Sequence, residues 1–260
     1  MPYDYLHIAV IQTDLIWENA KANRTRFEKL FLQLPNGTEL VILPEMFSTG
    51  FSMNVNQLGE PMNGKTICWL KDQAAAHGTV IAGSLMIRED GECFNRFVFV
   101  YPDQTLDFYD KRHLFSMGQE QMYFVPGLHR KIVQIKSFRI LPQICYDLRF
   151  PVFSRNRNDY DLMINCANWP GSRSDVWKTL LKARAIENQA YVIGVNRIGI
   201  DANKINYKGD SMVIDPKGKE MVTATEKEEI LPAKLSKESL DQFREKFPVL
   251  PDADNFSLCL

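Results

Sequence analysis

The sequence predicts an α/β fold organised as a single domain over residues 1–260, because short apolar runs alternate with amphipathic helical stretches along most of the chain. Hairpin signals in the middle argue against a purely parallel sheet. The composition, 45% hydrophobic and 24% charged, is that of a folded globular protein. A chain of this length buries ~70–75% of the surface that its unfolded form exposes, which is enough for a stable core without crosslinks.

The first half of the chain contains regular strand and helix patterns. In Leu6–Ile11, apolar residues occupy both the odd and the even positions, as in a strand that is covered on both faces. Apolar residues from Phe27 to Leu34 then follow helical spacing, and Pro35-Asn36-Gly37 ends that helix. Further elements are expected as a strand at Glu39–Leu43, a helix at Thr66–His77 closed by Gly78, a strand at Val80–Ile87, and two strands between Asn95 and Tyr109 around a turn at Pro102-Asp103.

The second half continues the alternation. Its clearest helix is Ser174–Gln189, with Ser172 or Ser174 as the N-cap and an apolar stripe that includes Trp177 and Leu181. Strands are expected at Lys131–Ile135, Ser137–Ile144, Asp161–Cys166, Tyr191–Val195 and Ser211–Ile214, and helices at Pro151–Arg157 and Lys237–Glu245. The strand at Ser211–Ile214 is expected to be the last one in the chain. The charge run Lys227-Glu228-Glu229 is interpreted as a solvated face.

Charge and cysteine content exclude several functional classes. Lys and Arg total 31 against 32 Asp and Glu, a net charge of −1, so neither nucleic acid nor an anionic membrane is expected as a partner. The cysteines have irregular spacing and form no CxxC pair, and none of the 4 histidines pairs at helical spacing. We therefore expect no disulfide framework and no metal site. Without a signal-peptide pattern or an apolar run of ~18 residues, the expected location is the cytoplasm.

The strongest candidate nucleophile is Cys145, which ends an apolar run just before the chain turns. A thiol at such a strand-to-helix turn is exposed at the sheet edge, and the helix N-terminus would lower its pKa. The alternative is a buried cysteine acting as a small hydrophobe. A cysteine–histidine pair with His113 or His129 is conceivable, although the papain-type signature is absent. The remaining cysteines are interpreted as packing or surface residues: Cys68, Cys93, Cys166 and Cys259.

Two further residues are candidates for acid, base or electrostatic roles. Glu45 follows a strongly apolar strand, a position where carboxylates often act as acids or bases, although a capping or ion-paired glutamate is the simpler interpretation. Lys111 follows the strand end at Tyr109-Asp110 and, taken alone, is interpreted as a surface lysine.

Considered together, these residues carry a family resemblance. Leu43-Pro44-Glu45-Met46, Asp110–Leu114 and Ile144–Pro151 resemble the three catalytic blocks of the nitrilase superfamily of carbon–nitrogen hydrolases, in the same order. Gly118–Gly127 is similar to the segment with the family's second glutamate, which maps onto Glu120. The resemblance covers almost the whole chain. It implies a four-layer αββα sandwich, a homodimer or larger homo-oligomer, and no cofactor or metal.

Within the superfamily, three segments resemble the bacterial omega-amidases: Cys145–Pro151, Ala167–Pro170 and Tyr207–Ser211. That branch hydrolyses the terminal amide of 2-oxoglutaramate and 2-oxosuccinamate, so the resemblance implies a small keto-amide substrate, with ammonia and a keto acid as products.

The resemblance assigns a role to each matched residue. Cys145 would form a thioester, Glu45 would shuttle protons, and Lys111 would stabilise the oxyanion together with the backbone N–H of Tyr146. Glu120 would orient Lys111 and the substrate, although a loop carboxylate paired with Lys111 or Arg112 is the alternative.

The substrate carboxylate requires a cation or a cluster of N–H donors, and arginine pairs with carboxylate through two hydrogen bonds. Arg173 is the preferred candidate, whereas Arg149 is expected to be a structural partner of Asp147 or Glu187. Trp169 and Tyr123 could form walls of the pocket or simply pack in the core.

Three alternatives remain open at this stage. Another nitrilase-superfamily amidase, a carbamoylase or a nitrilase would use the same glutamate, lysine and cysteine. A thiol-dependent acyl transferase would pass the thioester to an amine. A catalytically silent binding protein would keep only the fold.

Overall fold

The structure is a computed structural model that describes residues 4–258. Within these residues, strands form two six-stranded sheets and one two-stranded hairpin. The first sheet has the spatial order β14 (Glu229–Ser236), β1 (Tyr5–Gln12), β2 (Leu40–Ile42), β3 (Val80–Glu89), β4 (Glu92–Val100) and β5 (Leu106–Asp110). The second has the order β13 (Glu220–Thr223), β12 (Met212–Ile214), β9 (Tyr191–Asn196), β8 (Leu162–Ala167), β7 (Phe138–Ile144) and β6 (Val133–Ile135). The hairpin pairs β10 (Ile198–Ile200) with β11 (Asn206–Lys208).

Both sheets are mixed, as the hairpin signals predict. The central strands β1, β2 and β3 are parallel, as are β7, β8 and β9, and the outer strands pair antiparallel. The carboxyl ends of β2 and β7, and the end of the outer strand β5, therefore lead into the loops that carry the candidate site residues.

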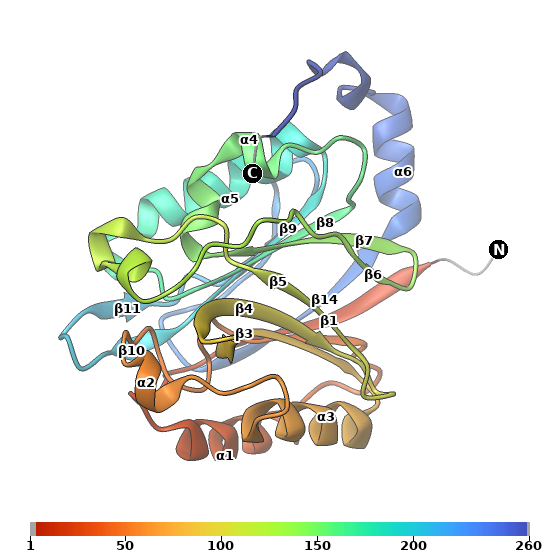
Figure 1. The fold of residues 1–260 in the computed structure, drawn as a ribbon. Helices are drawn as coiled ribbons and strands as arrows, with labels where there is room; N and C mark the ends of the chain where they lie inside the picture. Colours follow the sequence, from red (N-terminus) through yellow and green to blue (C-terminus); the bar gives the residue numbers. More distant parts are fainter. Residues whose placement is uncertain (1–3, 259–260) are drawn as a thin grey trace.

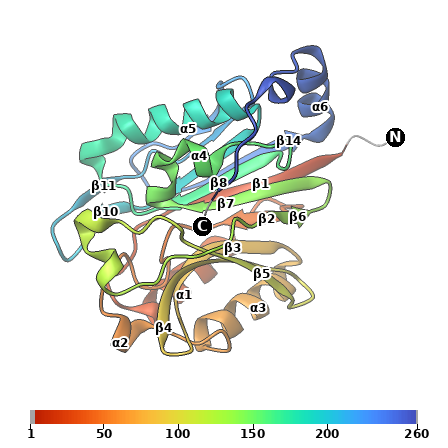
Figure 2. The same ribbon diagram turned by 45° about the horizontal axis from the view of Figure 1, so that its top comes forward.

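Helices cover the outer faces of the two sheets. In Figure 1, α1 (Ala20–Phe31) and α3 (Lys65–His77) lie on the opposite side of the molecule from α5 (Ser174–Asn188). Figure 2 gives the same arrangement after rotation, with the sheets between the two helical layers. The predicted four-layer αββα sandwich is confirmed. The shorter helices are α2 (Val55–Leu58), α4 (Pro151–Ser154), α6 (Lys237–Lys246), and the 3₁₀ turns η1 (Ser116–Gly118), η2 (Glu120–Met122), η3 (Cys145–Arg149), η4 (Gly171–Arg173) and η5 (Leu250–Asp252).

Strand parity explains how the layers are held together. Leu40 and Ile42 belong to the cluster between the two sheets, whereas Val41 belongs to the cluster beneath α1 and α3. Because alternate strand residues face opposite sides, a strand covered on both faces must be apolar at every position. A third cluster packs α5 on the second sheet through Trp177 and Leu181. The apolar runs in the sequence therefore report burial between layers.

Several predicted boundaries were wrong. The strand set does not close at Ile214, because β13 and β14 follow, and β14 pairs with the whole of β1. In the charge run, Lys227 and Glu228 are exposed, as expected of a solvated face, and the half-buried Glu229 begins β14. The helix at Pro151 ends at Ser154, and α5 has Arg173 at its N-cap position without a capping side chain. The edge strand β14 tolerates Pro232, which hides the strand pattern in the sequence.

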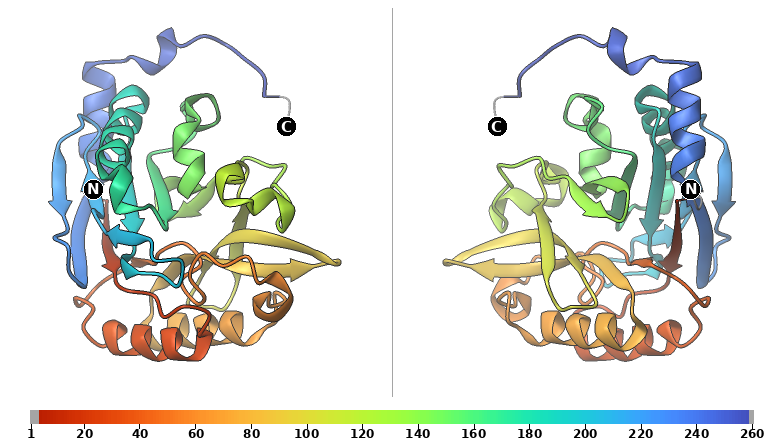
Figure 3. Two further views of the ribbon diagram at one scale, coloured as in Figure 1. Left: turned by 90° about the vertical axis from the view of Figure 1, so that its left-hand side faces the viewer. Right: turned by 90° about the vertical axis from the view of Figure 1, so that its right-hand side faces the viewer.

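The segment after α6 extends across one end of the molecule toward α4, as Figure 3 shows. Leu258 packs at the margin of the core between the sheets, and Arg157 lies 4.6 Å from the ring centroid of Phe256. Cys259, interpreted as a packing or surface residue, lies outside the described residues. No helix within residues 4–258 has both the length and the apolar character needed to cross a bilayer.

Candidate active site

Cys145 lies at a sharp turn where β7 ends. Its φ is +47°, a left-handed conformation that a residue with a side chain adopts only when its surroundings impose it. The backbone N–H of Ile144 donates to Asp147 Oδ2 at 3.0 Å, which closes the turn on its inner side. The partly buried Cys145 side chain is thereby placed at the strand end beside the carboxylate of Glu45.

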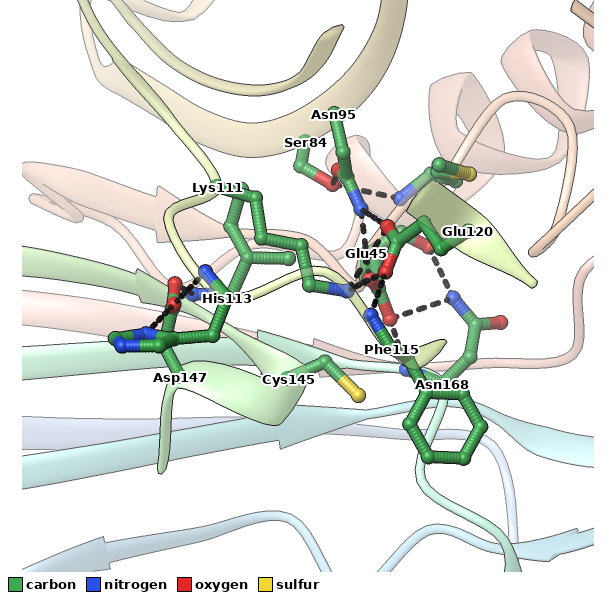
Figure 4. A network of polar contacts seen from close by, with 12 residues as sticks. Glu45, Ser84, Asn95, Lys111, His113, Phe115, Glu120, Cys145, Asp147 and Asn168 are labelled. Carbon is green, nitrogen blue, oxygen red and sulfur yellow. Dashed lines mark hydrogen bonds and ion pairs between the residues drawn. The ribbon is translucent and has the colours of Figure 1, made fainter. Parts of the chain in front are cut away.

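Asp147 ties this turn to the segment after β5. The buried carboxylate accepts hydrogen bonds from the Tyr109 hydroxyl at 2.8 Å and from the His113 backbone N–H at 2.9 Å. It also contacts His113 Nδ1 at 2.8 Å, and the His113 ring stacks on Phe150 with centroids 3.8 Å apart. The positions of the Cys145 turn and of the loop that begins at Lys111 are therefore linked through one carboxylate, on the left of Figure 4.

Glu45 follows β2 and is fully buried. The next residue, Met46, has a φ of +44°, so the chain turns sharply and directs the Glu45 carboxylate inward. Its Oε1 accepts from Lys111 Nζ at 3.0 Å and from Asn95 Nδ2 at 2.8 Å, and its Oε2 accepts from the backbone N–H of Asn168 at 2.8 Å. Hydrogen-bond donors therefore lie against both oxygens of Glu45 and fix the orientation of the carboxylate.

Lys111 and Glu120 complete a buried cluster (Figure 4). The Lys111 ammonium lies 3.0 and 2.9 Å from the two oxygens of Glu120, which also accepts from the Phe115 N–H at 2.6 Å. The Lys111 carbonyl accepts from Gly127 at 2.9 Å. A Cβ on Gly127 would lie 2.2 Å from the Asp110 carbonyl oxygen, so this close approach requires glycine.

Burial and neighbouring charges shift the protonation equilibria of the cluster. Burial alone would lower the pKa of Lys111, but the adjacent carboxylates of Glu120 and Glu45 raise it well above its usual value. Burial raises the pKa of Glu120, and the Lys111 charge opposes that shift. The ammonium is therefore a permanent cation at neutral pH.

The expected low pKa of the Cys145 thiol was wrong. Burial raises that pKa well above its usual value, the negative charge of Glu45 adds to the shift, and the Lys111 charge only partly offsets it. The short turn η3 does not compensate for burial next to a carboxylate. The resting group is a thiol, and the neighbouring carboxylate is placed to receive its proton.

Cys145 and Glu45 line a cavity of about 590 Å³. Tyr146, Arg149, Trp169 and Arg173 line it, whereas Tyr123 does not and is 43% exposed, so its expected place in the pocket wall was wrong.

Arg149 was also expected to pair with Asp147 or Glu187, and this was wrong. Asp147 is occupied by Tyr109 and His113, and Glu187 pairs with Arg184.

The sequence interpretation missed four polar residues of the site. Asn95 and Ser84 lie on β4 and β3, Asn168 follows β8, and Tyr207 on β11 lines the cavity. Asn168 and Tyr207 lie in segments that carry the omega-amidase resemblance, so that signal was available. Ser84 is a lone polar residue within an apolar stretch of β3, and Asn95 stands next to Arg96 in β4, so nothing in their spacing distinguishes them.

The remaining candidates are two histidines and three further cysteines. His113 is bound to Asp147 and His129 is exposed, so neither is positioned as a partner for Cys145. Cys68 is exposed on α3, and Cys93 and Cys166 are buried in strands. Across residues 4–258, no group of three or more His, Cys, Asp or Glu side chains could hold a metal ion.

The family model described as carbon-nitrogen hydrolase matches residues 7–245. This chain belongs to the carbon–nitrogen hydrolase family. It is 44% identical to omega-amidase YafV of Escherichia coli, covering 97% of this chain and 98% of that protein. It is 29% identical to 2-oxoglutaramate amidase of Bacillus subtilis, covering 94% and 96%.

A solved member of the family has the same architecture. The crystal structure of a CN-hydrolase superfamily protein from Xanthomonas campestris, with an arsenic adduct in its active site, matches with a TM-score of 0.96. It is 42% identical, and the match covers 98% of this chain and 99% of that one. The nitrilase superfamily predicted from the sequence is confirmed.

Proposed function

We propose that this protein is an omega-amidase that hydrolyses the terminal amide of 2-oxoglutaramate and 2-oxosuccinamate to the keto acid and ammonia. The observation that carries the chemistry is the buried cluster of Glu45, Lys111 and Glu120 next to the Cys145 thiol. Membership of the carbon–nitrogen hydrolase family and the near full-length similarity to omega-amidases support the substrate class.

In the first half-reaction, Cys145 Sγ attacks the amide carbon while Glu45 takes the thiol proton. Negative charge develops on the amide oxygen, where the Lys111 ammonium and the Tyr146 backbone N–H stabilise it. Glu45 then gives its proton to the amide nitrogen, the carbon–nitrogen bond breaks, and ammonia leaves. The acyl group remains on Cys145 as a thioester.

The second half-reaction uses the same carboxylate in the reverse order. Glu45 takes a proton from water as the water oxygen attacks the thioester carbon, and the carbon–sulfur bond breaks. The proton returns from Glu45 to the Cys145 sulfur, and the carboxylic acid product ionises on release. No net proton remains on Glu45, so the site is ready for another turnover.

Glu120 keeps the Lys111 ammonium in place for both steps. The two oxygens of Glu120 contact the same ammonium, so one of its N–H groups can turn toward the substrate oxygen while an ion pair persists. Glu120 therefore orients the cation.

The substrate carboxylate is assigned to the arginines of the cavity. Within the described part of the chain, neither Arg149 nor Arg173 is paired with a carboxylate; their guanidinium groups lie near the rings of Trp169 and Phe115. Apart from Glu45, the acids that line the cavity are Glu18, which accepts a hydrogen bond from Ser52, and Asp201, which accepts one from Tyr207.

Arg173 is the preferred ligand because its backbone carbonyl accepts from Trp169 Nε1 at 2.9 Å, which fixes the η4 turn at the cavity wall. Arg149 is the more exposed of the two arginines and lies across the ring of Trp169. Trp169 and Tyr146 then form apolar walls around the carbon chain of the substrate.

The deciding assay is ammonia release from 2-oxoglutaramate, measured beside glutamine, a simple aliphatic amide and a nitrile. We expect kcat/KM for the keto-amide to exceed that for glutamine by far, because glutamine carries an ammonium where the keto-amide has a neutral carbonyl. Hydrolysis of the nitrile or the simple amide without the keto-amide would retain the chemistry and reject the substrate. A homodimer or larger homo-oligomer and a cytoplasmic location are part of the same proposal, and sedimentation and cell fractionation test them.

A further inference from the structure

We infer that Asn95, oriented by Ser84, is a positioning residue that holds the Glu45 and Glu120 carboxylates on one side of Lys111. The inference rests on the proposed function, because it assigns the arrangement of the proposed base and its neighbours to a residue outside the matched catalytic blocks. Asn95 lies on β4 and is almost fully buried, and the view in Figure 4 places it above both carboxylates.

The Asn95 side-chain amide contacts both acids directly. Its Nδ2 donates to Glu45 Oε1 at 2.8 Å and to Glu120 Oε1 at 3.1 Å. The backbone carbonyl of the same residue accepts from the Lys111 N–H at 3.0 Å. Asn95 therefore contacts all three charged members of the cluster, two through its side chain and one through its backbone.

Ser84 fixes which way the Asn95 amide faces. The backbone N–H of Met46 can only donate, and it lies 2.9 Å from Ser84 Oγ. The Ser84 hydroxyl is thus left to donate to Asn95 Oδ1, 2.9 Å away. A flipped amide would place its NH₂ group against the serine and its oxygen against two carboxylates, so the network selects one orientation.

A neutral amide solves an electrostatic problem in this position. Two buried carboxylates share one ammonium group, and their mutual repulsion favours protonation of one of them. Two N–H donors oppose that protonation without adding a second cation. A second cation would make Glu45 a weaker base and a poorer acceptor for the thiol proton. In the described residues, the ionisable groups facing this network are Glu45, Lys111, Glu120, Cys145 and Cys166.

The test compares Asn95→Asp and Ser84→Ala with the wild-type enzyme. Asn95→Asp places a third carboxylate against the other two, so one of them must bind a proton at higher pH. We expect the acidic limb of kcat/KM against pH to move up by about one unit, with at least a tenfold loss on that limb. Ser84→Ala lets the amide turn and moves the limb in the same direction by less.

A second readout does not require the proposed substrate. The alkylation rate of Cys145 by iodoacetamide is followed by peptide mass spectrometry, and exposed Cys68 in the same samples provides an internal reference. We expect Asn95→Asp to slow alkylation of Cys145 at neutral pH while Cys68 reacts as in the wild type. The result stands even if the keto-amide is not hydrolysed, so the two proposals can fail separately.

Thr66→Val is the matched control. Thr66 is equally buried and its hydroxyl also bonds a carboxylate, that of Glu60, but it lies on α3 away from the cavity. All variants are compared by thermal unfolding. A lower Tm for Asn95→Asp and Ser84→Ala with the wild-type pH profile and the wild-type alkylation rate of Cys145 would overturn the inference, because Asn95 would then act only in folding.

Discussion

Replacing Lys111 by methionine separates the structural role of its charge from its catalytic role. Methionine has a similar length and keeps the apolar stem, but it leaves the carboxylates of Glu45 and Glu120 without a cation in a fully buried cluster. Lys111→Met is therefore expected to destabilise the fold and to abolish turnover. Glu120→Gln removes one of the two negative charges, so the double variant should recover part of the stability and none of the activity.

The size of each effect follows from the contacts. Removing one partner of a buried, hydrogen-bonded ion pair costs about 3–5 kcal/mol, because the remaining charge stays buried. The double variant should be more stable than the sum of the single changes by about 0.5–3 kcal/mol, the usual coupling between contacting groups. Loss of one oxyanion donor lowers kcat about 10²–10³-fold, and the second substitution does not restore it.

Urea unfolding followed by the fluorescence of the 4 tryptophans measures the free energies of unfolding. In Lys111→Met, unpaired carboxylates bind protons more readily in the folded state than in the unfolded state. That protonation stabilises the fold as the pH falls, so the stability deficit should shrink from pH 7 to pH 5. Wild-type stability in Lys111→Met, or strictly additive effects in the double variant, would refute the reasoning.

Four further predictions concern separate parts of the molecule. Cys145→Ala should lose all amidase activity with a near-wild-type Tm; retained turnover would exclude the thioester. Arg173→Ala should raise KM for keto-amides far more than for neutral amides, and equal losses would place the carboxylate elsewhere. Asp147→Asn leaves at least one of four hydrogen-bond donors unpaired and should lower both Tm and kcat, by about 1–3 kcal/mol in stability; unchanged stability would exclude this role. Burial alone would raise the pKa of Asp161, but hydrogen bonds from Arg139 and nearby positive charges outweigh burial and lower it. The ionised Asp161 therefore stabilises the fold above the usual carboxyl pKa, and this stabilisation is lost as the pH falls. Asp161→Asn should flatten the acid limb of the free energy of unfolding against pH, and an unchanged limb would contradict this.

The layered fold could be predicted because burial leaves a direct trace in the sequence. Strands between two layers, such as Leu6–Ile11, are apolar at both parities, and helices with one buried face show helical spacing. β14 was missed because an edge strand buries only part of its surface and tolerates Pro232 and charged residues. The N-cap of α5 was missed because the η4 turn leads directly into the helix.

Some residues of the candidate site could also be predicted from the sequence, and others could not. Glu45, Lys111 and Cys145 each lie shortly after the end of a strand, so their positions could be inferred from the sequence and its family resemblance. Asn95 could not, because its role depends on two carboxylates from distant segments reaching one amide. The shift of the Cys145 pKa was predicted with the wrong sign, because burial beside Glu45 cannot be read from the local sequence.

The central claim is that the acyl group of the substrate passes through a thioester on Cys145. The most direct measurement is a rapid acid quench of the enzyme during turnover of 2-oxoglutaramate, followed by mass spectrometry of the peptide that contains Cys145. The account predicts an adduct on that cysteine equal to the substrate less ammonia, removed by hydroxylamine and absent in Cys145→Ala. Steady turnover with no such adduct, or with the adduct on another residue, would contradict it.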